Sequence, residues 1–262
     1  MHRHVTLAGL SDIRLGVLAF GDSITNAGGE LQWGVALQSW ALWVARAAGL
    51  AFTNYAVDGA SVHDVVNQQI PAFELRHAYP GARYDVGAVY IGVNDVRAPD
   101  WNGVAFAADF ERVLAFLGER CERTLTLSAP LDLGRPRAGA KVLELDAIVE
   151  EAARRHGALL VDLRDFGARN LVMADHVHPT ALGQIAIAER ALGVLERDGL
   201  RVAARLSQLA SPERPSARQR LLGDLTYVYR RAKVGLRGLR ARAQSAPTER
   251  GQKHAPERPR AV

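Results

Sequence analysis

Ser23 stands where a nucleophile could act. It follows Gly21 and Asp22 directly after a short apolar run, residues 15–20 (LGVLAF). Because ligands gather at the carboxyl ends of strands in open α/β sheets, a hydroxyl at this point can face a substrate. A serine becomes a nucleophile only when a base lies within hydrogen-bond reach and a third group orients that base. The alternative interpretation is that Ser23 is an ordinary helix N-cap.

Residues 173–184 (MADHVHPTALGQ) offer a base together with its orienting group. Asp175 precedes His178 by three residues, so its carboxylate can hold the imidazole in one tautomer and stabilise it when protonated. Pro179 fixes the backbone at a helix start and favours an extended conformation at His178. The same pattern also fits a simpler role, in which Asp175 or Thr180 only caps the following helix.

A metal site is another interpretation of this segment, because Asp175, His176 and His178 are all potential ligands. Zinc sites take a third or fourth ligand from elsewhere, and the sequence shows no obvious partner motif. The single cysteine, Cys121, excludes a thiolate-rich zinc site and an internal disulfide framework. We therefore predict that no metal and no cofactor is needed.

Two further residues can donate hydrogen bonds to the oxyanion that develops during acyl transfer. Gly59, in NYAVDGAS, can present its backbone N–H without a side chain in the way, and Asn94, in VYIGVNDV, offers a side-chain amide. Each such donor contributes about 2.7–4 kcal/mol to catalysis. Both residues are also common in ordinary turns. We expect Asp22 and Asp95 to hold loops by hydrogen bonding rather than to contact substrate.

The elements that must position these residues alternate along the chain. Apolar runs and helical patterns follow one another from Leu15 to Leu200, which predicts a parallel sheet covered by helices on both faces. Right-handed crossovers place all strand ends on one edge, where Ser23, Gly59 and Asn94 would converge. The predicted strands are residues 15–20, 51–57, 85–91, 123–129 and 158–162, and the predicted helices are about 35–48, 62–70, 103–119, 141–156 and 180–197.

In this order and spacing the motifs resemble those of the SGNH (GDSL) hydrolase superfamily, named for Ser, Gly, Asn and His in four separate blocks. The resemblance covers about residues 15–197. One departure is Ile24, where the family name has leucine. The matching blocks are Gly21-Asp22-Ser23, Gly59, Gly92-Val93-Asn94-Asp95 and Asp175-His176-Val177-His178-Pro179.

The resemblance implies a serine esterase that works through an acyl-enzyme. Ser23 would be the nucleophile, His178 the general base and then acid, and Asp175 the group that orients it. The N–H groups of Ser23 and Gly59 and the side chain of Asn94 would form the oxyanion hole. The family hydrolyses lipids, thioesters, acylated sugars and small esters, and nothing in the sequence selects among these substrates.

We therefore predict a three-layer α/β/α domain of the flavodoxin-like type, with a parallel five-stranded sheet, over residues 1–200. The serine lacks the G-x-S-x-G elbow of the larger α/β-hydrolase fold. Two rival functions remain open. One is a non-catalytic binding module on the same fold, and the other is a membrane- or partner-docking protein whose function resides in the tail.

The net charge is divided unevenly between this domain and the tail. Residues 201–262 carry 15 Lys and Arg against four acidic residues, a net charge of +11, whereas residues 1–200 carry −6. Residues 245–262 have the composition of a disordered segment. Residues 217–243 fit a basic amphipathic helix, whose apolar stripe is Leu221, Leu225, Val228, Ala232, Leu236 and Leu239.

We expect the tail either to stay solvated or to bind an anionic membrane surface or a protein partner. No recognition motif supports binding of nucleic acid. The N-terminus lacks the uninterrupted apolar region of a secretory signal, and no stretch approaches the roughly 20 apolar residues of a membrane span. The sequence therefore predicts a cytoplasmic protein, which the tail can bring to the periphery of a membrane.

Overall fold

The computed structural model describes residues 14–30, 35–77, 83–168 and 170–206, and five single residues at 221, 225, 228, 229 and 232. The predicted disordered end, residues 245–262, lies outside the described residues, as does most of the predicted tail helix.

All five predicted strands are present in one parallel sheet, in the order β2-β1-β3-β4-β5. This is the flavodoxin-like order, and the three-layer α/β/α prediction is confirmed. The order reverses at β1, so the crevice between the carboxyl ends of β1 and β3 is where such folds bind ligands. The strands are β1 (Val17–Gly21), β2 (Phe52–Asn54), β3 (Tyr84–Tyr90), β4 (Cys121–Leu127) and β5 (Leu159–Val161).

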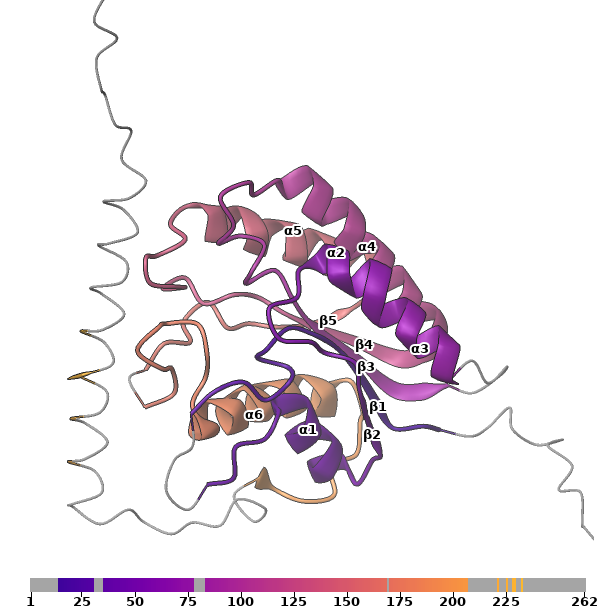
Figure 1. Ribbon diagram of the computed structural model, residues 1–262. Coiled ribbons are helices and arrows are strands. Elements are labelled where there is room, and N and C mark those ends of the chain that lie inside the picture. The colour runs from indigo at the N-terminus through magenta and orange to yellow at the C-terminus, as the bar shows by residue number, and fades with distance from the viewer. Residues whose placement is uncertain are drawn as a thin grey trace, which may run out of the picture.

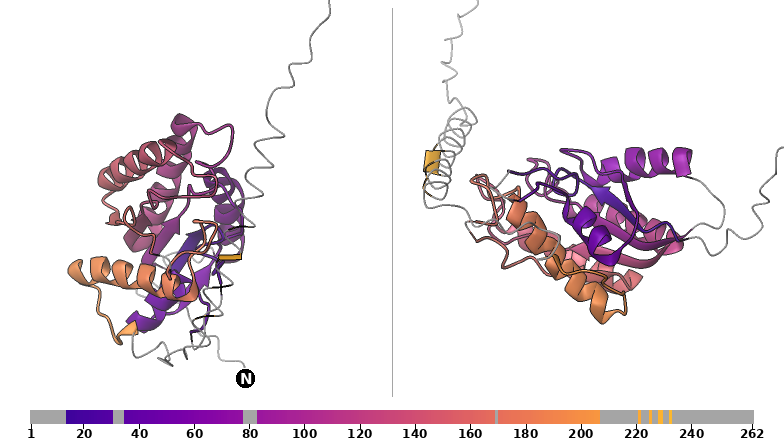
Figure 2. Two further views of the ribbon diagram at one scale, coloured as in Figure 1. Left: turned by 90° about the vertical axis from the view of Figure 1, so that its left-hand side faces the viewer. Right: turned by 90° about the horizontal axis from the view of Figure 1, so that it is seen from below.

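Helices cover both faces of the sheet. α1 (Trp40–Ala48) and α6 (Ala181–Arg197) pack on one face, and the others lie on the opposite face (Figure 1), as the two turned views also show (Figure 2). The helices of that second face are α2 (Val62–Asp64), the π-helical turn η2 (Val65–Gln69), α3 (Ile70–His77), α4 (Gly103–Arg120) and α5 (Lys141–His156).

Two predicted helix boundaries are wrong, and each has a local cause. The first helix begins at Trp40 rather than at residue 35, because the side chain of Ser39 accepts the N–H of Ala41 and caps the helix there. The second does not end at residue 70 but continues to His77. Pro71 has no N–H to donate into the preceding turn. The helix accommodates this proline because the residues before it form the wider π turn η2, in which the N–H of Ile70 donates to the carbonyl of Val65.

The core lies on both faces of the sheet. Residues 17–20 of β1 are completely buried, as expected for a parallel strand covered by helices on each side. The packed chain extends a little past the predicted boundary at residue 200. Leu206 is buried, and the N–H groups of Ala203 and Ala204 both donate to the carbonyl of Ala47 at the end of α1.

The five single residues of the tail that the structure describes are helical and exposed. Leu221, Leu225 and Val228 each leave about 60% of their surface in water. Their spacing places them on one helical stripe. Among the described residues, none of the helices has the length and apolar character to cross a bilayer.

Candidate active site

A continuous chain of hydrogen bonds joins Ser23, His178 and Asp175. The Oγ atom of Ser23 lies 2.9 Å from Nε2 of His178, although 155 residues separate the two in sequence. Nδ1 of the same imidazole lies 2.7 Å from Oδ2 of Asp175. Because the carboxylate can only accept, Nδ1 carries the proton and donates it to Asp175. Nε2 is therefore the atom free to accept the proton of the serine hydroxyl.

Asp175 is fixed by the loop that carries it. Its Oδ1 atom accepts the N–H groups of Val177 and His178 at 3.0 and 3.1 Å, which leaves Oδ2 for the imidazole. Burial opposes ionisation, but the hydrogen bonds from His178 and Val177 outweigh it and lower the pKa of Asp175. The cap of α6 is Thr180, whose hydroxyl accepts the N–H of Gly183, so Asp175 does not cap that helix.

Asp175 in turn controls the charge state of His178. The hydrogen bond from the imidazole to Asp175 raises the pKa of His178, burial opposes it, and the nearby carboxylate of Asp22 adds to the increase. The protonated imidazole is therefore stabilised relative to an isolated histidine. A histidine takes on this charged form when it acts as a general base toward a serine hydroxyl.

The turn that exposes Ser23 depends on a close approach of the backbone. Oδ1 of Asp22 accepts the N–H of Ile24 at 2.9 Å, and the N–H of Gly28 donates to the carbonyl of Ser23 at 2.5 Å. A Cβ atom on Gly28 would lie 2.6 Å from that carbonyl oxygen, which no side chain tolerates. Gly28 is therefore required for the turn to close behind Ser23.

Two buried glutamines hold this turn from opposite faces of the sheet, and sequence reasoning missed both. Gln69 of η2 bonds with Gly21 at the end of β1. Gln184 of α6 donates to the carbonyls of Ile24 and Gly28 at 2.9 and 3.2 Å. Its Oε1 atom also accepts the N–H of Trp40, so one amide joins α6, α1 and the serine turn. The sequence signal that could have found them is a polar residue on the buried face of a predicted helix.

The predicted oxyanion donors lie on neighbouring loops at the same edge. Nδ2 of Asn94 donates to the carbonyl of Ala60 at 3.0 Å, next to Gly59, and no described residue accepts its second hydrogen. Gly59 has a φ of +78°, and a Cβ atom there would meet nothing within 4 Å. Within the described part of the chain, no carbonyl or side chain accepts the N–H of Ser23 or of Gly59.

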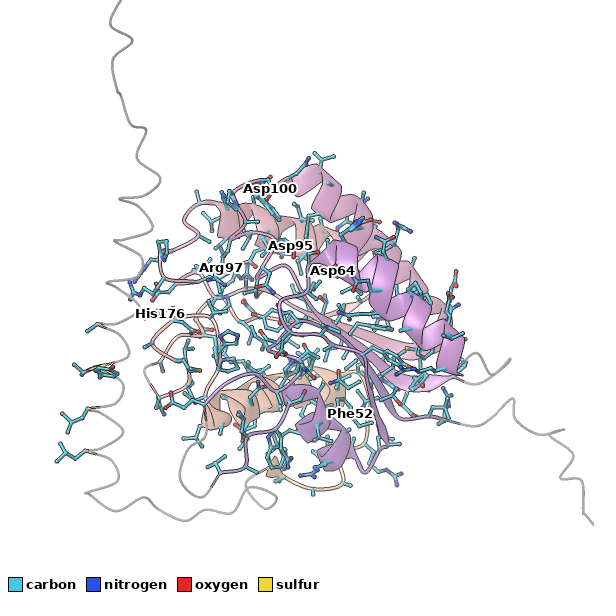
Figure 3. All side chains as sticks on the ribbon, in the orientation of Figure 1. Phe52, Asp64, Asp95, Arg97, Asp100 and His176 are labelled. Carbon is cyan, nitrogen blue, oxygen red and sulfur yellow. The ribbon has the colours of Figure 1, made fainter. Side chains whose placement is uncertain are left out.

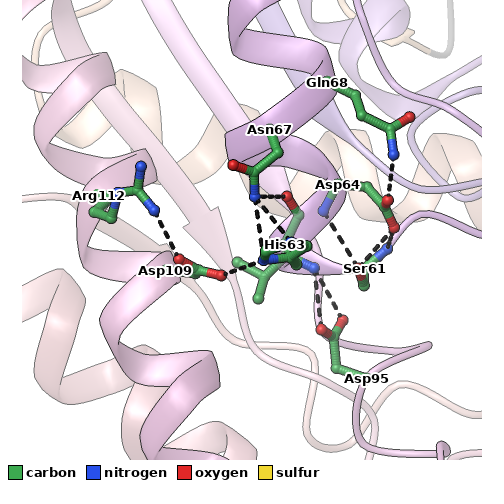
Figure 4. Close-up of polar contacts among 9 residues, drawn as sticks. Ser61, His63, Asp64, Asn67, Gln68, Asp95, Asp109 and Arg112 are labelled. Atoms are coloured by element: carbon green, nitrogen blue, oxygen red, sulfur yellow. Dashed lines mark hydrogen bonds and ion pairs between the residues drawn. The ribbon is translucent and has the colours of Figure 1, made fainter.

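Asp95 ties these two loops together, as the sequence led us to expect. Its carboxylate accepts the N–H of Val62 at 3.0 and 3.3 Å, at the first turn of α2 (Figure 4). Ser61 and Asp64 form a reciprocal capping box at the same turn. The loop that carries Gly59 is therefore fixed to the loop that carries Asn94.

His176 has side-chain partners other than Ser23, His178 and Asp175. Its Nδ1 atom lies 2.9 Å from Oδ2 of Asp132, and Arg135 donates to Nε2 at 2.9 Å. The ring therefore bridges to the loop after β4, on the edge that also carries Asp95 (Figure 3). Of the residues with assigned positions, no three His, Cys, Asp or Glu are grouped so that they could hold a metal ion. Burial raises the pKa of the Cys121 thiol to about 12, so this cysteine is inert.

One family of known proteins matches most of this chain. The pattern of the GDSL-like Lipase/Acylhydrolase family matches residues 19–186. No curated protein matches the chain.

Similar solved structures share the fold at low sequence identity. A lipolytic protein of the G-D-S-L family from Veillonella parvula is 21% identical with a TM-score of 0.55, and the match covers 70% of this chain and 98% of that one. An α/β hydrolase from the Lake Arreo metagenome is 22% identical (TM-score 0.54, 72% and 98% covered). An acetylxylan esterase from Geobacillus stearothermophilus is 18% identical (TM-score 0.53, 69% and 93% covered).

Proposed function

Since the chain belongs to the GDSL-like lipase/acylhydrolase family and is a serine ester hydrolase of that class, we propose that Ser23 cleaves a carboxylic ester through an acyl-enzyme. The observation that carries the proposal is the chain of hydrogen bonds from Ser23 through His178 to Asp175, at 2.9 and 2.7 Å. A nucleophile, a base and an orienting carboxylate in this order are what acyl transfer by serine requires.

In the first half of the reaction, Oγ of Ser23 attacks the ester carbonyl carbon while Nε2 of His178 takes the hydroxyl proton. The carbonyl oxygen becomes an oxyanion, which the N–H groups of Ser23 and Gly59 and the amide of Asn94 stabilise. The bond to the alkoxy oxygen then breaks, and His178 returns the proton to the departing alcohol. Ser23 is left as an acyl ester.

In the second half, water replaces the alcohol. His178 removes a proton from the water, whose oxygen attacks the acyl carbonyl, and the same donors stabilise the second oxyanion. The proton then returns through His178 to Oγ of Ser23 as the carboxylic acid leaves. No cofactor enters either half.

The acetylxylan esterase with the same fold supports these roles. Its catalytic mutants replace a serine, an aspartate and a histidine, and the last two stand three residues apart. Asp175 and His178 have the same separation here. The substrate is a small-molecule or lipid ester, and an acylated sugar is one candidate because that neighbour is an acetylxylan esterase.

The tail supports a second element of the proposal, attachment to an anionic membrane surface. Leu221, Leu225 and Val228 are exposed on one stripe of a segment with a net charge of +11. Basic amphipathic helices bind anionic lipids in this way, and such lipids line the cytoplasmic face of cell membranes. The protein would therefore act in the cytoplasm, at the periphery of the membrane.

Substitution of Ser23 with labelling by a fluorophosphonate tests the catalytic proposal. Ser23→Ala should abolish hydrolysis of p-nitrophenyl esters from acetate to decanoate, and the reagent should label Ser23 alone in the wild type. His178→Ala should lose most of the activity. His63→Ala is the matched control for that variant and should keep it. His63 also bonds to a carboxylate, that of Asp109 at 3.1 Å (Figure 4), but no serine hydroxyl is bonded to its ring.

Activity should also persist in EDTA. Turnover that survives in Ser23→Ala, or label on another serine, would refute the nucleophile. Loss of activity on chelation and its return with zinc would reassign Asp175, His176 and His178 as metal ligands.

A further inference from the structure

Arg97 is a cation at the edge of the candidate site, and no carboxylate among the described residues pairs with it. It follows Asn94 by three residues and is exposed. Its side chain lies across Gly134, because a Cβ atom on that glycine would be 3.2 Å from Nε and 3.5 Å from Cδ of Arg97. In the part of the chain that the structure describes, the guanidinium of Arg97 makes no hydrogen bond and no ion pair.

The turn beneath Arg97 is joined to the loop of the catalytic base. The N–H of Gly134 donates to the carbonyl of His176 at 2.8 Å, two residues before His178. Arg97 and His176 lie on the same edge of the molecule (Figure 3). The guanidinium is close enough to His178 for its charge to act on the imidazole, against the larger effect of Asp175.

A second arginine, Arg135, lies on the same turn as Gly134. Arg135 follows Gly134 and donates to Nε2 of His176, while its own Nε atom is buried and has no acceptor among the described residues. The acid of this turn, Asp132, is already occupied by Arg137 at 2.6 Å and by His176. Neither Arg97 nor Arg135 has a carboxylate partner in the described structure.

This arrangement has a cost for catalysis when the site is empty. The proposed reaction creates an imidazolium at His178, and the positive charge of Arg97 opposes it. An anion bound to Arg97 would cancel this repulsion and would leave the favourable effect of Asp175. Guanidinium groups bind carboxylate and phosphate oxygens through paired, charge-assisted hydrogen bonds.

We propose that Arg97, assisted by Arg135, binds an anionic group of the substrate. The ester would then carry a carboxylate or a phosphate within a few bonds of the scissile carbonyl. This inference rests on the proposed function and adds the chemical class of the substrate. Arg97 is a specificity residue in this view, because it contacts the substrate and not the reacting atoms.

Two matched pairs of esters distinguish the sources of the anion. In the first pair, p-nitrophenyl hemisuccinate carries a carboxylate on its acyl side and is compared with neutral p-nitrophenyl butyrate. In the second pair, the acetate ester of glycerol 3-phosphate carries a phosphate on its alcohol side and is compared with neutral glycerol monoacetate. The measured quantity is the ratio of kcat/KM for the charged ester to that for its neutral partner.

Arg97→Gln should lower this ratio at least tenfold for one of the pairs, and Arg97→Lys should restore part of it. Arg112→Gln is the control, since Arg112 is an exposed arginine on α4 that is paired with Asp109. It should leave both ratios unchanged. Ratios in Arg97→Gln within twofold of the wild type for both pairs would overturn the inference.

A binding measurement separates this inference from the proposed function. Monomethyl succinate and inorganic phosphate are titrated calorimetrically into wild-type, Arg97→Gln and Arg112→Gln proteins. Loss of binding in Arg97→Gln alone supports the anion site even if none of the esters is hydrolysed. Equal binding by all three proteins, or no binding by any, overturns the anion site. If neutral esters are still hydrolysed in that case, the proposed esterase function stands without it.

Discussion

The side-chain amide of Gln69 makes two hydrogen bonds with the backbone of Gly21, two residues before Ser23. Nε2 donates to the carbonyl at 2.8 Å, and Oε1 accepts the N–H at 3.0 Å. Gln69 is only 2% exposed and lies in the π turn that precedes Pro71. Gln69 in the π turn η2 thus fixes the end of β1, and the position of Ser23 depends on it.

Gln69→Met should therefore destabilise the fold and slow acylation. Methionine has a similar length but leaves the N–H of Gly21 without this acceptor, at about 1–3 kcal/mol for a buried group, whereas the carbonyl of Gly21 keeps the N–H of Val57 as a donor. Urea unfolding should show a loss of about 1–3 kcal/mol, and the rate of fluorophosphonate labelling at Ser23 should fall. The control is Gln68→Met, an exposed neighbour in the same turn, which should change stability by less than about 0.5 kcal/mol. Equal effects of the two substitutions would contradict the positioning role.

The dependence of activity on pH should report His178. Its hydrogen bond to Asp175 raises the pKa of His178, so kcat/KM should fall on the acid side with a pKa above the ordinary value of 6.5. Activity is lost as pH decreases because only the neutral imidazole can accept the serine proton. In Asp175→Asn this acid limb should move to lower pH, and the plateau should drop by about 10³–10⁴-fold. An acid limb that stays in place would show that another group controls it.

Asp22 should make the folded state sensitive to pH. Burial raises the pKa of Asp22 to about 7, against the N–H of Ile24 and the charge of His178. The folded state thus holds this proton more tightly than the unfolded chain, and stability decreases as pH rises from about 4 to about 7. An asparagine at this position cannot ionise. The free energy of unfolding of Asp22→Asn, relative to that of the wild type, should therefore be up to about 4 kcal/mol higher at pH 8 than at pH 4. Urea unfolding at both pH values measures this, and an equal effect at the two would exclude the buried carboxyl as the cause.

Asn94→Ala should reduce kcat by about 10²–10³-fold if the amide donates to the oxyanion. KM should change little, because the interaction forms only in the transition state. Asn67→Ala serves as the control, since Asn67 is exposed on η2 and bonds locally, to His63 (Figure 4). A rise in KM with kcat unchanged would instead place Asn94 in ground-state binding.

A chain that ends at Ser207 should keep its activity on soluble esters and lose binding to anionic vesicles. The end point preserves Leu206, which is buried, and the hydrogen bonds of Ala203 and Ala204 to Ala47. Co-sedimentation with anionic and neutral vesicles at low and high salt measures the attraction, which should weaken as salt screens it. Equal binding by full-length and shortened chains would show that the tail is no membrane anchor. Loss of soluble activity would show that the tail packs on the catalytic domain.

The strands and the long helices were predictable because each has a clear hydrophobic pattern that tertiary packing does not override. α5 has the predicted bounds, 141–156, since its periodicity is regular and Gly157 ends it in a left-handed conformation. The order of the motifs likewise predicted which side chains meet at the carboxyl edge. Sequence spacing cannot show which long-range contacts hold them there. Gln69 and Gln184 read as ordinary helix residues, and their function depends on backbone groups 48 and up to 160 residues away.

The π turn was missed for a related reason. Pro71 is normally a signal that ends a helix, and the predicted helix stops at residue 70. The chain instead continues because tertiary packing buries Val65, Val66 and Gln69 against the sheet. Arg97 was also overlooked, since a single arginine after the Asn94 block has no pattern of its own.

The separation of Ser23 and His178 also decides when this enzyme can first work. Ser23 follows the first strand to be synthesised, while His178 lies just before α6, the helix whose Gln184 holds the serine turn. The pairing of Ser23 with His178 therefore requires that α6 has docked on the sheet. During refolding, activity should therefore return with these contacts of long sequence separation rather than with secondary structure, so that turnover reports the docking of α6.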